Sequence, residues 1–317
     1  MRSFAFVFPG QGSQAVGMLD AWGDHPAVVE TLKEASDALG EDVALLIAQG
    51  PKEALALTTN TQPVMLVAGV AAYRAWLHEG GAKPTVLAGH SLGEYSALVA
   101  SGVLSLADAA PLVRFRAQAM QEAVPVGQGA MAAVLGMAAE QVVEVCQAVQ
   151  ATFDATSGEV VQAVNFNDPK QTVIAGSKLA VEQAMVALKE AGAKRALPLP
   201  VSAPFHSSLM KPAADRLAQR FAEVTWHAPT IPVVNNIDVA VETDLSRIQS
   251  ALVRQAYGPV RWVECIGAIH AQGVQTVIEC GPGKVLAGMS SRINGELTSA
   301  ALYDSATLTQ VQELLQA

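Results

Sequence analysis

The chain has 317 residues, 51% of them hydrophobic, which is enough to bury a large core in one domain with an insertion or in two domains. Its net charge of −9 at pH 7 argues against general affinity for nucleic acid, because such binding neutralises phosphates with basic side chains. The longest apolar stretch, residues 63–73, ends at Arg74 well short of a bilayer span, so we expect no membrane-spanning helix and no membrane partner.

The N-terminus favours a cytoplasmic protein. The apolar run over residues 4–8 is too short for a secretory signal and is typical of an opening strand. The three cysteines, Cys146, Cys265 and Cys280, are an odd number without C-x-x-C spacing, so neither a disulfide framework nor a zinc site is predicted. We expect each of them to be a small buried side chain.

Two glycine-containing turns follow predicted buried strands. The first strand, residues 4–8, leads directly into Gly10-Gln11-Gly12-Ser13-Gln14. A second apolar strand over residues 86–88 leads through Gly89-His90-Ser91-Leu92-Gly93 into a predicted helix over residues 94–100. Turns at the ends of buried strands are where α/β enzymes keep active-site loops.

The middle of the chain changes to shorter elements. Ser105 and Asp108 have the spacing of a helix cap, and the helix should continue to about Glu122. From about Gly129 the sequence predicts strands and helices in the order β-α-β-β-α-β, at residues 130–135, 139–149, 160–164, 172–175, 179–191 and 195–199.

That order of elements is typical of a ferredoxin-like domain. We therefore expect residues 129–200 to form a small inserted ferredoxin-like α+β domain. Residues 1–128 and 201–317 would then form one large catalytic α/β domain, similar to the α/β-hydrolases, built from both ends of the chain.

Residues 89–93 fit the G-x-S-x-G nucleophile elbow, in which a sharp turn from strand to helix exposes a serine hydroxyl. An idle serine in a glycine-flanked turn would show the same pattern, and the strand before and helix after it favour the elbow. The helix N-terminus also offers unpaired backbone N–H groups, the first at Leu92, where an oxyanion would develop. Ser91 is therefore the candidate nucleophile.

A serine hydroxyl needs a base at neutral pH, and the six histidines are the candidates. His206 follows the last strand of the predicted insertion, at a domain junction where active sites tend to gather. The other histidines lie in contexts more typical of surface or packing positions: His25, His78, His90, His227 and His270. The residues alone leave open whether His206 is the base or a junction histidine without a catalytic role.

Several motifs occur together and in one order over nearly the whole chain. They are Gly10-Gln11-Gly12-Ser13-Gln14, Gly89-His90-Ser91-Leu92-Gly93-Glu94-Tyr95, Arg116, Phe205-His206-Ser207, Val233-Val234-Asn235-Asn236, Gln255 and Gly281-Pro282-Gly283-Lys284. In this combination the sequence resembles the malonyl-CoA:acyl carrier protein transacylases of bacterial fatty acid synthesis. The set is far more specific than any one of its members.

The resemblance implies an acyltransferase that moves a malonyl group from malonyl-CoA to the phosphopantetheine thiol of acyl carrier protein. The reaction would be ping-pong, through a covalent malonyl-serine at Ser91, with His206 as the base. It would require no cofactor and no metal. Malonyl-CoA and acyl carrier protein are the implied partners.

The resemblance also implies roles for the residues around the nucleophile. The backbone N–H groups of Gln11 and Leu92 would form the oxyanion hole. The main-chain carbonyl of Gln255 would orient the histidine in place of a carboxylate. Arg116 would bind the malonyl carboxylate, and Phe205 would crowd the acyl α-carbon.

Two other functions use the same motifs. A serine hydrolase such as a thioesterase would share the elbow and the histidine, but no carboxylate is placed in the usual Ser-Asp-His order and no His-Gly-Gly-Gly loop is present. A non-catalytic acyl-binding protein with the same fold would have no need of Ser91, His206 and Gln11.

Overall fold

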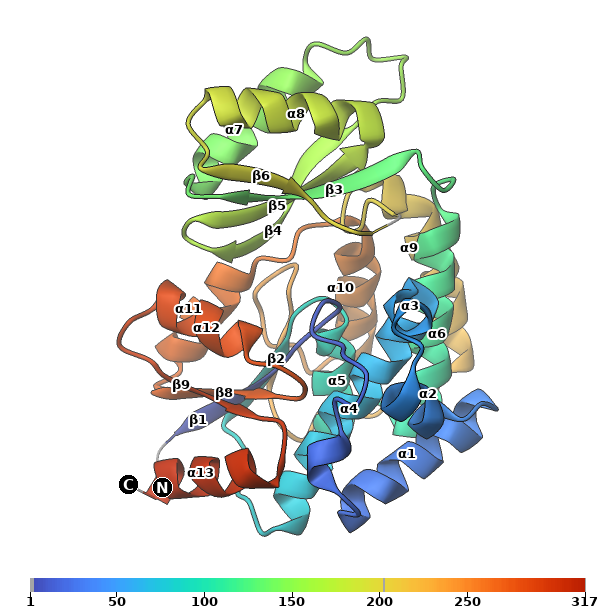
Figure 1. The fold of residues 1–317 in the computed structure, drawn as a ribbon, viewed down its shortest axis with the longest axis vertical. Helices are drawn as coiled ribbons and strands as arrows, with labels where there is room; N and C mark the ends of the chain where they lie inside the picture. The colour runs from blue at the N-terminus through green and yellow to red at the C-terminus, as the bar shows by residue number, and fades with distance from the viewer. Residues whose placement is uncertain (1–2, 202, 317) are drawn as a thin grey trace.

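A computed structural model describes residues 3–201 and 203–316. In this part of the chain, helices surround a parallel sheet of five strands and an antiparallel sheet of four. Figure 1 shows the smaller sheet with its two helices at the top of the view, above the larger sheet and the remaining helices. The α/β class expected from the sequence is confirmed.

The parallel sheet takes its strands from both ends of the chain, in the spatial order β7-β2-β1-β8-β9. The strands are β1 (Phe4–Phe8), β2 (Val86–Gly89), β7 (Val233–Val234), β8 (Thr276–Cys280) and β9 (Thr298–Leu302). The helices around it are α1 (Pro26–Leu39), α2 (Val43–Gln49), α3 (Lys52–Ala56), α4 (Thr58–His78), α5 (Gly93–Ala100), α6 (Leu106–Glu122), α9 (Lys211–Arg220), α10 (Leu245–Tyr257), α11 (Trp262–Ala271), α12 (Val285–Ile293) and α13 (Ser305–Gln316). Short 3₁₀ turns are η1 (Asp20–Trp22), η2 (Ser208–Met210) and η3 (Phe221–Glu223).

Strand β1 is apolar throughout because helices cover both faces of the sheet. Side chains alternate between the two faces of a strand. Phe6 packs edge-on against Tyr73 and Trp76 of α4 on one face, whereas Val7 belongs to a separate cluster with Trp262 of α11 on the other. A shift of β1 by one residue would exchange the side chains of its two faces, so packing in both clusters fixes its register.

The smaller sheet has the spatial order β4-β5-β3-β6 and belongs to a continuous segment of the chain. Its elements are β3 (Gly129–Leu135), α7 (Ala139–Gln150), β4 (Val161–Asp168), β5 (Gln171–Ser177), α8 (Lys178–Glu190) and β6 (Arg195–Pro198). The predicted succession β-α-β-β-α-β is therefore confirmed. One face packs against α7 and α8, through residues such as Val142 and Val181.

The other face of this sheet packs on the larger part of the molecule. Met131 and Val173 share a cluster with Met120 of α6 and with Phe205. Strand β4 is also joined to the larger part by backbone bonds, from Phe166 N–H to the Val260 carbonyl (2.9 Å) and from Val260 N–H to the Val164 carbonyl (2.8 Å). The two parts are held together along one edge strand and one apolar face.

Strand β4 is longer than expected. The sequence predicted a strand over residues 160–164, whereas β4 continues to Asp168. Its second half contains Asn165 and Asn167, so the apolar alternation that marks a strand is lost there. Pairing with β5 on one side and with Val260 on the other keeps this polar segment extended.

Two further expectations can be compared with the structure. Cys146, Cys265 and Cys280 are free and buried, as predicted. Over the described residues, no helix combines the length and the apolar character needed to cross a membrane.

The strand-to-helix turn after β2 depends on a very close approach of backbone segments. A Cβ atom on Gly93 would lie 2.0 Å from the Phe8 carbonyl oxygen of β1, and one on Gly89 would lie 1.9 Å from the Gly93 carbonyl carbon. No side chain fits at either position. The two glycines of the motif therefore let α5 start directly against the ends of β1 and β2.

We predict that Gly93→Ala lowers the free energy of unfolding by at least about 1–3 kcal/mol, the usual cost of overpacking. Gly267→Ala is the matched control, because Gly267 lies exposed within α11 and an added Cβ meets nothing within 4 Å. In that helix, alanine should stabilise by roughly 0.5–1 kcal/mol. Thermal unfolding of both variants measures the difference, and equal stability of the two would contradict the close approach at Gly93.

Candidate active site

Ser91 lies in the turn between β2 and α5 with a φ of 52°, a left-handed conformation that is costly for a residue with a side chain. Side-chain amides hold this backbone in place. Asn236 Oδ1 accepts from Ser91 N–H (2.8 Å), and Asn236 Nδ2 donates to the Gly89 carbonyl (2.8 Å). Gln255 Nε2 donates to the Ser91 carbonyl (2.9 Å). These three hydrogen bonds therefore hold Ser91 in the left-handed conformation and keep it from relaxing to a more favourable φ.

His206 lies within hydrogen-bond distance of the Ser91 hydroxyl, with 2.7 Å between Nε2 and Oγ. Its Nδ1 lies 2.8 Å from the main-chain carbonyl of Gln255. A carbonyl can only accept, so Nδ1 carries the proton and Nε2 is free to accept from the serine hydroxyl. Burial, and then the nearby charge of Arg116, lower the pKa of His206 to about 3. The imidazole is therefore neutral at neutral pH, as a base must be.

Arg116 of α6 points into the same site and is 1% exposed. Its guanidinium donates to Gln62 Oε1 (2.7 Å), to Gln255 Oε1 (3.0 Å) and to Ser91 Oγ (3.2 Å). It also lies over the ring of Tyr95, 5.5 Å from the centroid. Burial lowers its pKa. Among the described residues, no carboxylate forms an ion pair with Arg116, and its Nε has no hydrogen-bond partner.

Arg114, two residues earlier on α6, is placed differently. It forms an ion pair with Glu41 and, among the described residues, makes no hydrogen bond to the site residues that Arg116 contacts. Residues two apart on a helix point to different faces. Only one of the two arginines is therefore available to the site.

Glu94 is a residue whose role the sequence did not indicate, although it directly follows the elbow motif. Its Oε2 accepts from Asn236 N–H (2.9 Å) and from Gln255 Nε2 (3.0 Å). Burial raises its pKa to about 7, although the bonds from Gln255 and Asn236 oppose that shift. Glu94 thus ties together the two amide residues that hold the Ser91 backbone.

A cavity of about 110 Å³ opens onto Ser91. It is lined by every predicted site residue except Gln255, which lies behind the histidine. The small sheet adds Met131 and Asn165 to its walls. Within the described residues, the backbone N–H groups of Gln11 and Leu92 make no hydrogen bond, so both are free to bind an oxygen atom in the cavity.

Comparison with known proteins places these features in a family. Residues 5–302 match the acyl transferase domain family. The chain is 54% identical over 315 residues to the malonyl CoA-acyl carrier protein transacylase of Escherichia coli K12, covering 99% of this chain and 100% of that protein. The Bacillus subtilis protein of the same name is 45% identical over 97% of this chain and 96% of its own length. The chain belongs to the malonyl CoA-acyl carrier protein transacylase family.

Solved structures of the transacylase family have the same fold. The acyl-carrier-protein S-malonyltransferase of Burkholderia pseudomallei is 61% identical, with a TM-score of 0.95, over 98% of this chain and 99% of that one. A malonyl-transacylase solved in complex with a type II polyketide synthase acyl-carrier protein is 50% identical, with a TM-score of 0.94, over 98% and 99%.

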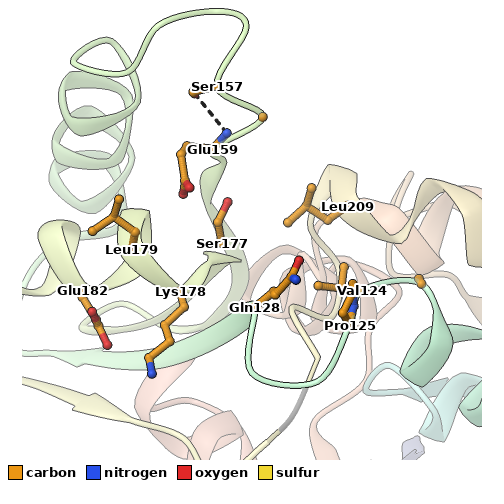
Figure 2. Close-up of a pocket in the computed structure, with 12 residues that line it drawn as sticks. Val124, Pro125, Gln128, Ser157, Glu159, Ser177, Lys178, Leu179, Glu182 and Leu209 are labelled. Atoms are coloured by element: carbon orange, nitrogen blue, oxygen red, sulfur yellow. Dashed lines mark hydrogen bonds between the residues drawn. The ribbon is translucent and has the colours of Figure 1, made fainter.

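A second, larger hollow of about 570 Å³ shares no lining residue with the Ser91 cavity. Figure 2 shows Glu159, from the connection between α7 and β4, and Lys178, the first residue of α8, on one side, and Val124 and Leu209 on the other. No predicted site residue lines this hollow, so its larger size does not make it the candidate active site.

The lowered pKa of His206 leads to a pH prediction. A histidine whose folded pKa lies near 3 stays an uncharged base as pH falls through 6.5, the ordinary histidine value. We expect the rate at which a serine-directed fluorophosphonate labels Ser91 to stay constant as pH falls through 6.5. Samples quenched at successive times and analysed by intact mass spectrometry give that rate, and Ser91→Ala serves as the blank. A decline centred near 6.5 would mean that solvent reaches the imidazole.

Proposed function

We propose that the chain transfers a malonyl group from malonyl-CoA to the phosphopantetheine thiol of acyl carrier protein, in fatty acid synthesis, by a ping-pong mechanism through malonyl-Ser91. One observation carries this proposal: a serine–histidine pair lies directly beside a buried arginine that has no carboxylate partner among the described residues. The names of its relatives, malonyl CoA-acyl carrier protein transacylases, support the same substrates.

In the first half-reaction, Ser91 Oγ attacks the thioester carbonyl carbon while its proton passes to His206 Nε2. The carbonyl oxygen becomes an oxyanion, which the N–H groups of Gln11 and Leu92 bind. The Gln255 carbonyl stabilises the imidazolium through Nδ1–H. The C–S bond then breaks, and the leaving thiolate takes the proton from His206.

The second half-reaction reverses these steps with a new thiol. The carrier-protein thiol gives its proton to His206 and attacks the ester carbonyl of malonyl-Ser91. The C–O bond breaks, and Ser91 Oγ takes the proton back from the imidazole. Each half-reaction begins and ends with a neutral histidine, which suits a group whose pKa is lowered by burial.

The buried guanidinium supplies the selectivity for malonyl. Burying a cation without an ion-pair partner is expensive, and a substrate carboxylate would offset that cost. Arg116 Nη2 already lies 3.2 Å from Ser91 Oγ, so a carboxylate bound there sits close to the nucleophile. A guanidinium binds a carboxylate through two parallel hydrogen bonds, which fixes orientation as well as position. Phe205, 8% exposed, lines the same cavity and would limit bulk at the acyl α-carbon.

Transfer rather than hydrolysis is favoured by the walls of the cavity. Met120, Met131, Leu199 and Val201 line it beside Phe205, and these side chains offer a hydrolytic water no hydrogen bond. The base is oriented by a backbone carbonyl rather than by a carboxylate, unlike the usual triad of serine hydrolases.

We propose the two-domain organisation that the sequence predicted. Residues 129–200 would be an inserted ferredoxin-like domain, and residues 1–128 and 201–317 one α/β-hydrolase-like catalytic domain. The strand order β4-β5-β3-β6 and the two-sided burial of β1 support this division. The cytoplasmic location expected from the sequence stays a prediction.

The covalent intermediate is tested by intact mass spectrometry after mixing the protein with malonyl-CoA. We expect a single malonyl adduct on the wild type and none on Ser91→Ala. His206→Ala should form the adduct slower by several orders of magnitude, because an unassisted serine is a poor nucleophile. Release of malonate without an adduct would indicate a hydrolase, and neither product would indicate a binding protein.

The proposed role of Arg116 predicts a substrate-dependent loss. Arg116→Ala should lower kcat/KM for malonyl-CoA by roughly 30-fold to several thousand-fold, equivalent to the ~2–5 kcal/mol lost when a desolvated charge pair is broken. Acetyl-CoA, which lacks the carboxylate, should be transferred as well as before or better. Arg114→Ala is the matched control and should change neither rate much. Equal impairment with both substrates would make Arg116 a structural residue.

A further inference from the structure

We propose that His25, His78 and Glu79 form a binding site for a divalent transition-metal ion of the Zn²⁺ type, away from the Ser91 cavity. His25 immediately precedes α1, His78 ends α4, and Glu79 follows it. Figure 1 shows the start of α1 and the end of α4 at the bottom of the view, at the opposite end of the molecule from the small sheet. The cysteine spacing and the transacylase resemblance predicted no metal, and in the sequence His25 lies far from His78 and Glu79.

The spacing of the donor atoms fits a tetrahedral ion. Glu79 Oε1 lies 3.3 Å from His25 Nε2 and 3.0 Å from His78 Nδ1, and the three ligand atoms lie within 4.8 Å of one another. Zn²⁺ bonds of about 2.0–2.2 Å in a tetrahedron place neighbouring donors about 3.3 Å apart. Two of the three donor separations are therefore already close to this value, and the third, between the two imidazoles, lies within 4.8 Å.

His25 provides the second, independent observation. Its side chain is 10% exposed, and among the described residues Nδ1 has no hydrogen-bond partner, while Nε2 has only the 3.3 Å ion-pair contact with Glu79 Oε1. The ring packs edge-on against Trp22 (5.8 Å between centroids) and His78 (5.1 Å), so Nε2 is held facing the Glu79 carboxylate. A nitrogen that is shielded from water and has only this long contact is poorly satisfied, and a metal bond to Nε2 would replace the contact with a stronger one.

The other two ligands keep the site open to solvent. The side chains of His78 and Glu79 are 49% and 47% exposed, so an ion can enter and keep a water as its fourth ligand. The Glu79 carbonyl accepts from Gln312 of α13 (2.9 Å), which fixes the end of α4. Two imidazoles with one carboxylate suit Zn²⁺, Co²⁺ or Ni²⁺, whereas Mg²⁺ and Ca²⁺ prefer oxygen ligands alone. A bound ion would join the start of α1 to the end of α4.

The test is titration of the tag-free full chain with Zn²⁺ by calorimetry, together with the visible absorption of bound Co²⁺. We expect one ion per chain, a Co²⁺ band of tetrahedral strength and a higher Tm with Zn²⁺ present. His25→Asn should weaken Zn²⁺ binding by at least about 100-fold, since losing even an outer-shell partner costs roughly 10–100-fold. His78→Asn and Glu79→Gln alter exposed side chains, so they carry the test if His25→Asn fails to fold.

His270→Asn is the matched control. His270 Nε2 lies 3.6 Å from Glu296 Oε2 in an exposed pair with a single imidazole, so removing it should leave Zn²⁺ binding unchanged. Absence of Zn²⁺ binding to the wild type would overturn the proposal and leave a plain ion-pair cluster. Binding that survives His78→Asn and Glu79→Gln would also overturn it, since the ion would then bind elsewhere. These outcomes do not depend on malonyl transfer. The metal-site proposal can therefore be contradicted without affecting the proposed function, and the reverse also holds.

Discussion

The left-handed backbone of Ser91 is the constraint on which the rest of the site depends. A residue with a side chain adopts that conformation only when its surroundings enforce it. Here the enforcement comes from Asn236 and Gln255, which bond to the two backbone polar groups of Ser91. Glu94 in turn accepts from both of those residues. The hydroxyl is therefore presented at a fixed place above the sheet before any substrate arrives.

One of these amide residues, Gln255, also positions the charged group and the base of the site. Gln255 accepts from Arg116 through its side chain and from His206 through its main chain, so one residue positions both the cation and the imidazole. Neutral acceptors satisfy part of the guanidinium without neutralising it. The result is a buried positive charge beside a neutral base, and the proposed preference for an anionic acyl group rests on this arrangement.

The small sheet forms part of the wall of this site. Its apolar face packs against Met120 and Phe205, and its edge strand β4 pairs with Val260. Met131 and Asn165 thereby reach the cavity wall, although they lie in a segment separate from the catalytic motifs. Part of the apolar cavity wall beside Ser91 depends on this packing, and so does the orientation of the polar half of β4.

The sequence by itself determined the local structure, because strand and helix periodicity, glycine positions and caps act over a few residues. It located the elbow at Ser91 and the β-α-β-β-α-β order, both of which the structure bears out. Tertiary structure alone decided which histidine meets Ser91, since Ser91 and His206 are 115 positions apart and touch only through packing. The same holds for the support that Glu94 and Asn236 give, and for the approach of His25 to His78. Hydrogen bonds across such separations leave no periodic trace in a sequence, because the fold and not the spacing brings their partners together.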